Sequence, residues 1–340
     1  MMSRQVPALS SLCIFLLVLR ALDITNIGGY ALTFRYVYFD NDEQDFKSRG
    51  WLDYDSLFQQ NLEAVSDIYC DYLDADDIEL VVQVKADRYV PRAGSTFNLG
   101  RYLGKSNKTG LDLWEPAPLT KILGKRGQFN SFEIVVSINA EFVESAYWFD
   151  PTPWDRYDIP VPRGRSDFVS IMLHEIGHGL GFAGTINFDP NDPRYGTYEG
   201  KFNYLTPFDE LTSFAGDGYA VDVMTGLPNP MSFDGAISKK IYSGNAIPLA
   251  NVAPNNQLFS QNFYHLGDCD SPVIVQGSVM TGCFMTLGPD FNELSCLDLA
   301  VLADLGYPLK EDAFDELCET SSMPHTASRH LASTGILGAF

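Results

Sequence analysis

The chain has 340 residues, of which 45% are hydrophobic and 20% are charged, as in a folded globular protein and unlike a disordered one. It carries 23 Lys and Arg residues against 44 Asp and Glu residues, a net charge of −21 at pH 7. This charge argues against nucleic acid or an anionic membrane as the main partner, because both would repel the protein.

Residues 1–31 have the pattern of an export signal. Arg4 is followed by a short apolar run that ends at Leu19, and Ala21 or Ala31 offers a cleavage position. The run is too short to span a bilayer as a helix, and no later stretch is long enough either. We therefore expect a secreted or periplasmic protein with no membrane span after cleavage.

Export would place the cysteines in an oxidising compartment. Cys13 lies in the signal, and the other five predict two disulfides and one thiol. The order of the cysteines does not give the pairing, although the four nearest the C-terminus are the natural pool: Cys269, Cys283, Cys296 and Cys318.

The N-terminal half alternates strand and helix patterns. Residues 32–39 (LTFRYVYF) predict a strand, and residues 54–73 predict an amphipathic helix. Two more strands are expected at 77–86 and 132–139. Between them, residues 92–128 are rich in Gly, Lys and Asn, which predicts long loops with a short hairpin at most.

A Pro-rich connection over 150–165 leads to a helix that Ser166 or Asp167 can cap and that Gly179 and Gly181 end. The chain is then loop-rich to about residue 262.

One more amphipathic helix is expected at 295–305, stopped by Gly306 and Pro308, and a loose tail follows.

The helix before Gly181 contains the sequence HEIGH. His174 and His178 are four residues apart, so both imidazoles project from one helix face and can bind one metal ion. Glu175 can reach a water molecule at that metal without ligating it. The alternative is a structural helix that carries two solvated histidines.

These residues resemble the metzincin clan of zinc metalloproteases, whose extended motif is HExxHxxGxxH. His174, Glu175, His178 and Gly181 match it, whereas Gly184 stands where the third histidine would be. A third ligand must therefore come from elsewhere in the chain.

The chain has five histidines, and two of them, His325 and His330, lie in the expected tail. His265 remains as the candidate third ligand. Asp189 and Asp209 stay open as alternatives because Asp can replace His on zinc, and Glu199 or Glu210 would suit a different zincin arrangement.

Within the metzincins, the chain resembles the leishmanolysin-like peptidases and similar exported bacterial metalloproteases. HEIGHGLGF is followed by an insertion, then by His265 in YHLGD, Met280 in GSVMTG and the run SCLDLAVLADLGYP. The resemblance implies a methionine turn at Met280, preferred over Met285, beneath the metal. Gly282 stands where many metzincins have a tyrosine, and Tyr264 is a candidate substitute.

The resemblance implies an α+β, metzincin-like fold: a twisted mixed sheet with two helices above the cleft (32–182), and a loop-rich lower part with the methionine turn and closing helix (183–308). Together these form one catalytic domain, and residues 309–340 form a flexible tail.

The implied function is that of a monomeric, secreted zinc endopeptidase acting on protein or peptide substrates. One zinc ion is bound by His174, His178 and His265, and Glu175 is the general base. Structural calcium stays open. The alternatives are a non-catalytic binding or adhesion protein on a zincin scaffold and a zinc amidase acting on cell-wall peptides.

Overall fold

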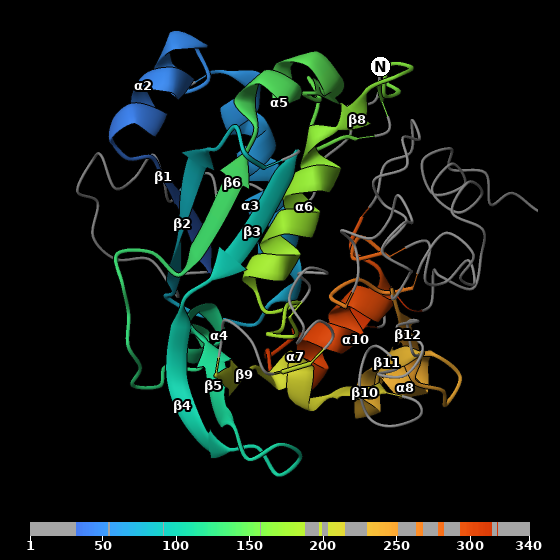
Figure 1. Ribbon diagram of the computed structural model, residues 1–340. Helices are drawn as coiled ribbons and strands as arrows, with labels where there is room; N and C mark the ends of the chain where they lie inside the picture. Colours follow the sequence, from blue (N-terminus) through green and yellow to red (C-terminus); the bar gives the residue numbers. More distant parts are fainter. Residues whose placement is uncertain are drawn as a thin grey trace, which may run out of the picture.

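The computed structural model describes residues 32–53, 55–90, 92–156, 158–187, 197–198, 203–214, 230–250, 263–267, 278–281, 293–314 and 318. The predicted α+β composition is confirmed, with sheets that mix parallel and antiparallel pairing (Figure 1). The predicted signal at 1–31 lies outside these ranges, as does most of the predicted tail at 309–340, of which only residues 309–314 and 318 are described. Within them, no helix has both the length and the apolar character needed to cross a membrane.

The largest sheet has four strands in the order β1-β2-β6-β3. Their bounds are Thr33–Val37 for β1, Glu79–Ala86 for β2, Ile134–Ile138 for β6 and Ala93–Phe97 for β3. The first three correspond to the predicted strands and pair in parallel, whereas β3 runs antiparallel to β6 at the edge. β2 and β6 are rich in buried Val and Ile, as central strands require.

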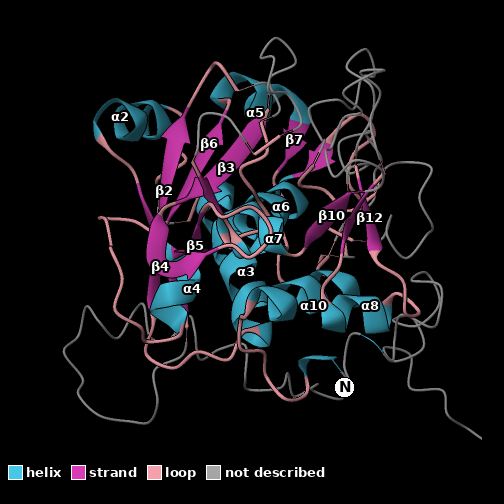
Figure 2. Cartoon of the chain, turned by 60° about the horizontal axis from the view of Figure 1, so that its bottom comes forward, coloured by secondary structure: helices cyan, strands magenta, loops and turns pink. Residues whose placement is uncertain are grey.

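Two predicted helices pack against each other and against this sheet (Figure 2). They are α3 (Leu57–Tyr72) and α6 (Phe168–Gly179). The Tyr69 hydroxyl of α3 donates a hydrogen bond of 2.7 Å to the Leu173 carbonyl of α6. Both residues are buried, so this bond fixes how far α6 can slide along α3.

The ends of α6 follow the sequence prediction. Asp167 caps its first turn by accepting from the Ser170 amide at 2.7 Å, and the same carboxylate forms a buried ion pair with Arg156. Beyond the helix, Gly181 has φ +115°, which favours glycine and turns the chain sharply.

The prediction of loops over 92–128 is wrong. Besides β3, this stretch forms β4 (Leu99–Lys105), β5 (Asp112–Pro116) and α4 (Ala117–Ile122), and only the β4–β5 hairpin was foreseen. The glycines in this stretch obscure the alternating pattern of a strand. The strands form because β3 pairs with β6 and β5 pairs with β9 (Tyr204–Leu205), although their local propensity is low.

Four further elements of the N-terminal half were not predicted: α2 (Asp40–Ser48), α5 (Ala140–Ala146) and the two short paired strands β7 (Tyr147–Trp148) and β8 (Ser166–Asp167).

The C-terminal part is built from short elements among long connections. Their bounds are Tyr204–Leu205 (β9), Pro207–Glu210 (α7), Thr212–Phe214 (β10), Met231–Phe233 (β11), Ala236–Ile241 (α8), Ile247–Leu249 (β12) and Cys296–Leu305 (α10). α10 matches the predicted closing helix and starts with a capping box of Ser295 and Asp298. It ends at Gly306, whose φ is +105°.

Cys296 and Cys318 form a disulfide, which confirms one bridge within the predicted pool. Cys269 and Cys283 lie outside the described residues. Cys70 is buried, and its thiol donates to the Leu32 carbonyl.

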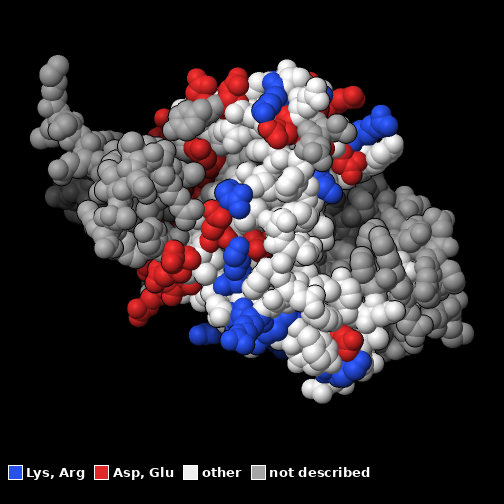
Figure 3. All heavy atoms as spheres, turned by 90° about the vertical axis from the view of Figure 1, so that its left-hand side faces the viewer, with Lys and Arg blue, Asp and Glu red and all other residues white. Residues whose placement is uncertain are grey.

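Charge is distributed unevenly over the surface. Figure 3 shows one face on which Lys and Arg side chains gather in the lower part and Asp and Glu side chains lie above and to one side. Three cations on or near β4 form ion pairs with carboxylates: Arg101 with Glu115, Lys105 with Asp112 and Lys121 with Glu133. This local pairing limits how strongly the basic residues could attract an anion.

Candidate metal centre

Helix α6 presents two imidazoles to one point, as the spacing predicted. The Nε2 atoms of His174 and His178 lie 3.1 Å apart, and both side chains are buried. Glu175, between them in sequence, is 2% exposed. The alternative of two solvated histidines is wrong, because both rings lie inside the protein.

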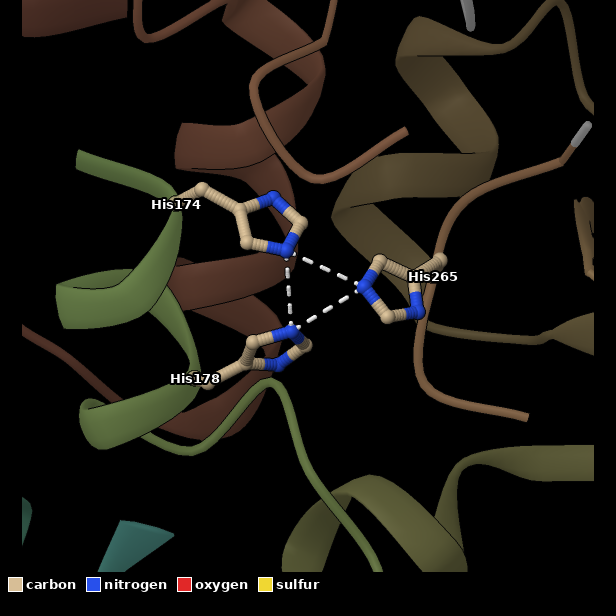
Figure 4. Close-up of side chains that lie close together, drawn as sticks. All are labelled: His174, His178 and His265. Carbon is tan, nitrogen blue, oxygen red and sulfur yellow. Dashed lines mark hydrogen bonds between the residues drawn. The ribbon is translucent and has the colours of Figure 1, made fainter. Parts of the chain in front are cut away.

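The third histidine comes from residues 263–267, far along the chain. His265 Nε2 lies 3.0 Å from His174 Nε2 and 3.1 Å from His178 Nε2 (Figure 4). The Ala250 amide donates to the His265 carbonyl at 2.9 Å, so β12 and its continuation hold this short segment. Among the described residues, these three histidines form the group that could hold a metal ion.

Backbone carbonyls fix the protonation of two of the rings. His174 Nδ1 lies 2.7 Å from the Val279 carbonyl, and His178 Nδ1 lies 2.6 Å from the Phe182 carbonyl. A carbonyl only accepts, so each Nδ1 carries the hydrogen and each Nε2 keeps a lone pair. Burial lowers the pKa of His174 to about 3 and that of His178 to about 4, so both rings are neutral at pH 7.

This donor set fits a metal ion. The Nε2 lone pairs of His174 and His178 face each other and cannot hydrogen-bond together, whereas a cation between them would satisfy both. Nitrogen ligands of a tetrahedral zinc site, bonded at about 2.0–2.1 Å, are separated by roughly 3.3 Å. The three observed separations of 3.0–3.1 Å are close to that value.

A turn at Ser278–Met280 lies beneath α6. Val279 supplies the acceptor for His174, and Met280 is fully buried with its sulfur next to Gly177. This matches the expected place of Met280, whereas Met285 and Gly282 lie outside the described residues.

Asp298 of α10 holds that turn in place. Its carboxylate accepts from the Val279 amide at 3.0 Å, from the Met280 amide at 3.3 Å and from the Ser278 hydroxyl. Sequence reasoning missed this role. The pattern Ser295-x-x-Asp298 indicates a capping box, but not that the same carboxylate also reaches residues 278–280.

Glu175 has the environment of a proton acceptor. Burial raises its pKa to about 8, and its Oε2 has no hydrogen-bond partner within the described part of the chain. Ser95 of β3 donates to the Glu175 backbone carbonyl at 2.5 Å, which ties the sheet edge to this turn of α6. One carboxylate oxygen is thus available on the helix that carries His174 and His178.

Asp209 is not a ligand, contrary to the alternative that the sequence left open. Both of its carboxylate oxygens accept from the Thr185 amide, at 3.1 Å each. Glu210 also points elsewhere and accepts from the Ser106 hydroxyl at 2.6 Å. Asp189 and Glu199 lie outside the described residues.

Tyr264, the candidate substitute for the missing tyrosine, donates its hydroxyl to the Ile186 carbonyl at 2.6 Å. Its hydroxyl therefore holds the loop after α6, which gives Tyr264 a structural task next to His265.

No protein-family model matches this chain, and no curated protein matches it. The function of the chain is therefore inferred from the geometry of the site.

Proposed function

We propose that the protein is a zinc-dependent endopeptidase with a metzincin-like arrangement of its site. The observation that carries this proposal is the triangle of three Nε2 atoms, with the unpartnered Oε2 of Glu175 on the same helix. A sheet above, a methionine-containing turn below and a closing helix also support it. Export stays a prediction from residues 1–31.

His174, His178 and His265 would hold the zinc ion. When bound, zinc would polarise the scissile carbonyl and a water molecule, and its charge would favour the ionised form of Glu175. The remaining chemistry belongs to side chains of this protein.

Glu175 is the proposed general base. Its Oε2 accepts a proton from water as the new C–O bond forms, and the same proton passes to the amine nitrogen as the C–N bond breaks. Glu175 is buried, so little solvent competes for the proton while the carboxyl holds it.

β3 is the proposed guide for an extended substrate. It is the edge strand of the four-stranded sheet, and it is tied to α6 at the Glu175 carbonyl. A peptide paired to this edge would run past the three histidines. This arrangement favours an extended polypeptide substrate.

The test compares wild type, His265→Ala and Glu175→Gln, purified without chelator. We expect one zinc per wild-type chain by elemental analysis, and loss of most of it in His265→Ala. Glu175→Gln preserves the shape of the side chain but cannot accept the proton. It should keep its zinc and lose casein hydrolysis by about 10²–10⁴-fold.

Other outcomes would contradict the proposal. Zinc without hydrolysis of casein by the wild type would favour a binding protein, and hydrolysis of cell-wall peptides alone would favour an amidase. No zinc in the wild type, even after its addition, would remove the metal centre. Near wild-type turnover by Glu175→Gln would refute the role of Glu175.

A further inference from the structure

Asp209 is a buried carboxylate that binds two separate segments of the chain. It is 1% exposed and stands at the third position of α7. Its carboxylate accepts from the Thr206 amide at 2.9 Å and from the Thr185 amide at 3.1 Å. The hydroxyls of the two threonines lie 3.0 and 3.2 Å from it, and each lies closer to a backbone carbonyl, that of Ala183 at 2.9 Å for Thr206 and that of Tyr204 at 2.7 Å for Thr185. Only the Thr206 contacts belong to the helix cap, so the bond to Thr185 is an additional one that ties α7 to residue 185.

Thr185 lies in residues 182–186, which we call the bridging segment. This segment follows the turn at Gly181 and contains Gly184, the position at which the metzincin motif would have its third histidine. A Cβ atom at Gly184 would overlap Asp209 Oδ1, and it would also lie 3.0 Å from the ring of Tyr264. The Asp209 carboxylate therefore occupies the space that any side chain at position 184 would need.

The bridging segment contacts the metal centre at both ends. At one end, the Phe182 carbonyl accepts from His178 Nδ1 at 2.6 Å. At the other end, the Ile186 carbonyl accepts from the hydroxyl of Tyr264, the neighbour of His265, at 2.6 Å. One short backbone segment thus orients one histidine and restrains the residue next to another.

We propose that Asp209 is a positioning residue for the metal centre, acting by holding the bridging segment between His178 and His265. This inference rests on the metal centre of the proposed function. A carboxylate suits the position because the amides of Thr185 and Thr206 both point at it and it only accepts. An asparagine side chain would keep one acceptor oxygen, and its own N–H groups would face the donors of Thr185 and Thr206. The hydrogen bonding that holds Thr185 would therefore weaken.

The test measures metal binding by the full chain after chelator treatment, with zinc and cobalt as the probes. Asp209→Asn should weaken zinc affinity by about 10–100-fold, as loss of a residue that orients metal ligands usually does. It should also alter the visible spectrum of bound cobalt, because the histidine geometry changes. Thr185→Val, which removes one donor, should weaken affinity less, and Thr185→Ser should behave as wild type.

The matched control is Glu133→Gln, which changes a carboxylate that is 2% exposed, directly before β6, and bonded to the Val81 amide of β2 at 2.7 Å. We expect it to lower Tm without changing zinc affinity or the cobalt spectrum.

The outcomes separate the two proposals. Absence of metal binding by the wild type overturns the proposed function. A wild type that binds metal, with unchanged affinity and cobalt spectrum in Asp209→Asn, overturns the positioning role. Equal weakening in Glu133→Gln also overturns it, because the effect would then follow general stability. If Asp209→Asn does not fold, the zinc affinities of Thr185→Val and Thr185→Ser are compared instead. Equal zinc affinities in these two variants overturn the inference.

Discussion

Glycines in α6 serve close packing at the cost of helix propensity. A Cβ atom at Gly177 would lie 2.5 Å from the Met280 sulfur, and one at Gly179 would overlap the Ile134 side chain of β6. In an exposed helix, glycine costs about 1 kcal/mol relative to alanine. Here the missing side chains let the methionine turn and the sheet approach the helix that carries His174 and His178.

Gly179→Ala should therefore destabilise the protein, although alanine has a higher helix propensity than glycine. Overpacking of a core typically costs about 1–3 kcal/mol, which exceeds the propensity gain. The control is Gly94→Ala in β3, where an added Cβ meets nothing within 4 Å. We expect urea unfolding to show a lower midpoint for Gly179→Ala and little change for Gly94→Ala. A higher midpoint for Gly179→Ala would show that Ile134 moves away without cost.

At the scale of elements, two helices each hold a distant segment of the chain in place. Each of α7 and α10 begins with a capping box whose aspartate also binds a distant segment: Asp209 holds Thr185, and Asp298 holds Val279. Each of these segments provides the carbonyl that receives a histidine Nδ1 hydrogen. Local capping and the order of the metal centre are therefore coupled.

Helix α3 carries a titratable carboxyl group, that of Asp67, which is remote from the histidines. Asp67 accepts from the Trp154 indole at 2.9 Å, and burial raises the pKa of Asp67 from 3.8 to about 6. The folded protein thus binds this proton more tightly than the unfolded chain does. The associated stability is fully present below pH 3.8 and is lost as pH rises through about 6.

Asp67→Asn should remove this dependence. The free energy of unfolding of the variant minus that of wild type should be larger at pH 8 than at pH 4 by on the order of 1–2 kcal/mol. The reason is that only the wild type must ionise a half-buried acid as the pH rises. Urea unfolding of both proteins at several pH values measures the difference, and all other titrating groups cancel in it. A difference that stays constant with pH would contradict the raised pKa.

At the scale of the whole molecule, the metal centre joins distant parts of the chain. His174 and His178 belong to the helix packed on the large sheet, whereas His265 belongs to a segment next to β12 and the Met280 turn. A metal bound to all three would link these parts. It would bind the folded state far better than the unfolded one, in which the three side chains are not assembled.

Chelation should therefore lower the thermal stability of the wild type. Metal at about 100 times its Kd stabilises by about 2.7 kcal/mol, which corresponds to roughly 4–5 °C in Tm for a protein of this size. Calorimetry with zinc and with chelator measures the shift. His265→Ala should show little difference between the two conditions, and an equally small difference in the wild type would show that no metal is bound.

Features that depend on local pattern could be predicted from the amino-acid sequence. The period of apolar residues located β1, β2, β6, α3, α6 and α10, and the four-residue spacing placed His174 and His178 on one helix face. His265 could be predicted because the chain contains so few histidines. All of these inferences need only neighbouring residues or composition.

The tertiary structure alone decided what depends on contacts between distant residues. β3, β4 and β5 contain glycine and lack a clear alternation, so their order comes from pairing with other strands. Asp209 had the chemistry of a ligand, and only the structure shows that its carboxylate binds the Thr185 and Thr206 amides and lies outside the histidine cluster. The carboxylate that excludes a side chain at Gly184 lies 25 residues further along the chain. Spacing in a sequence does not encode that approach, because it arises only when α7 packs beside the end of α6.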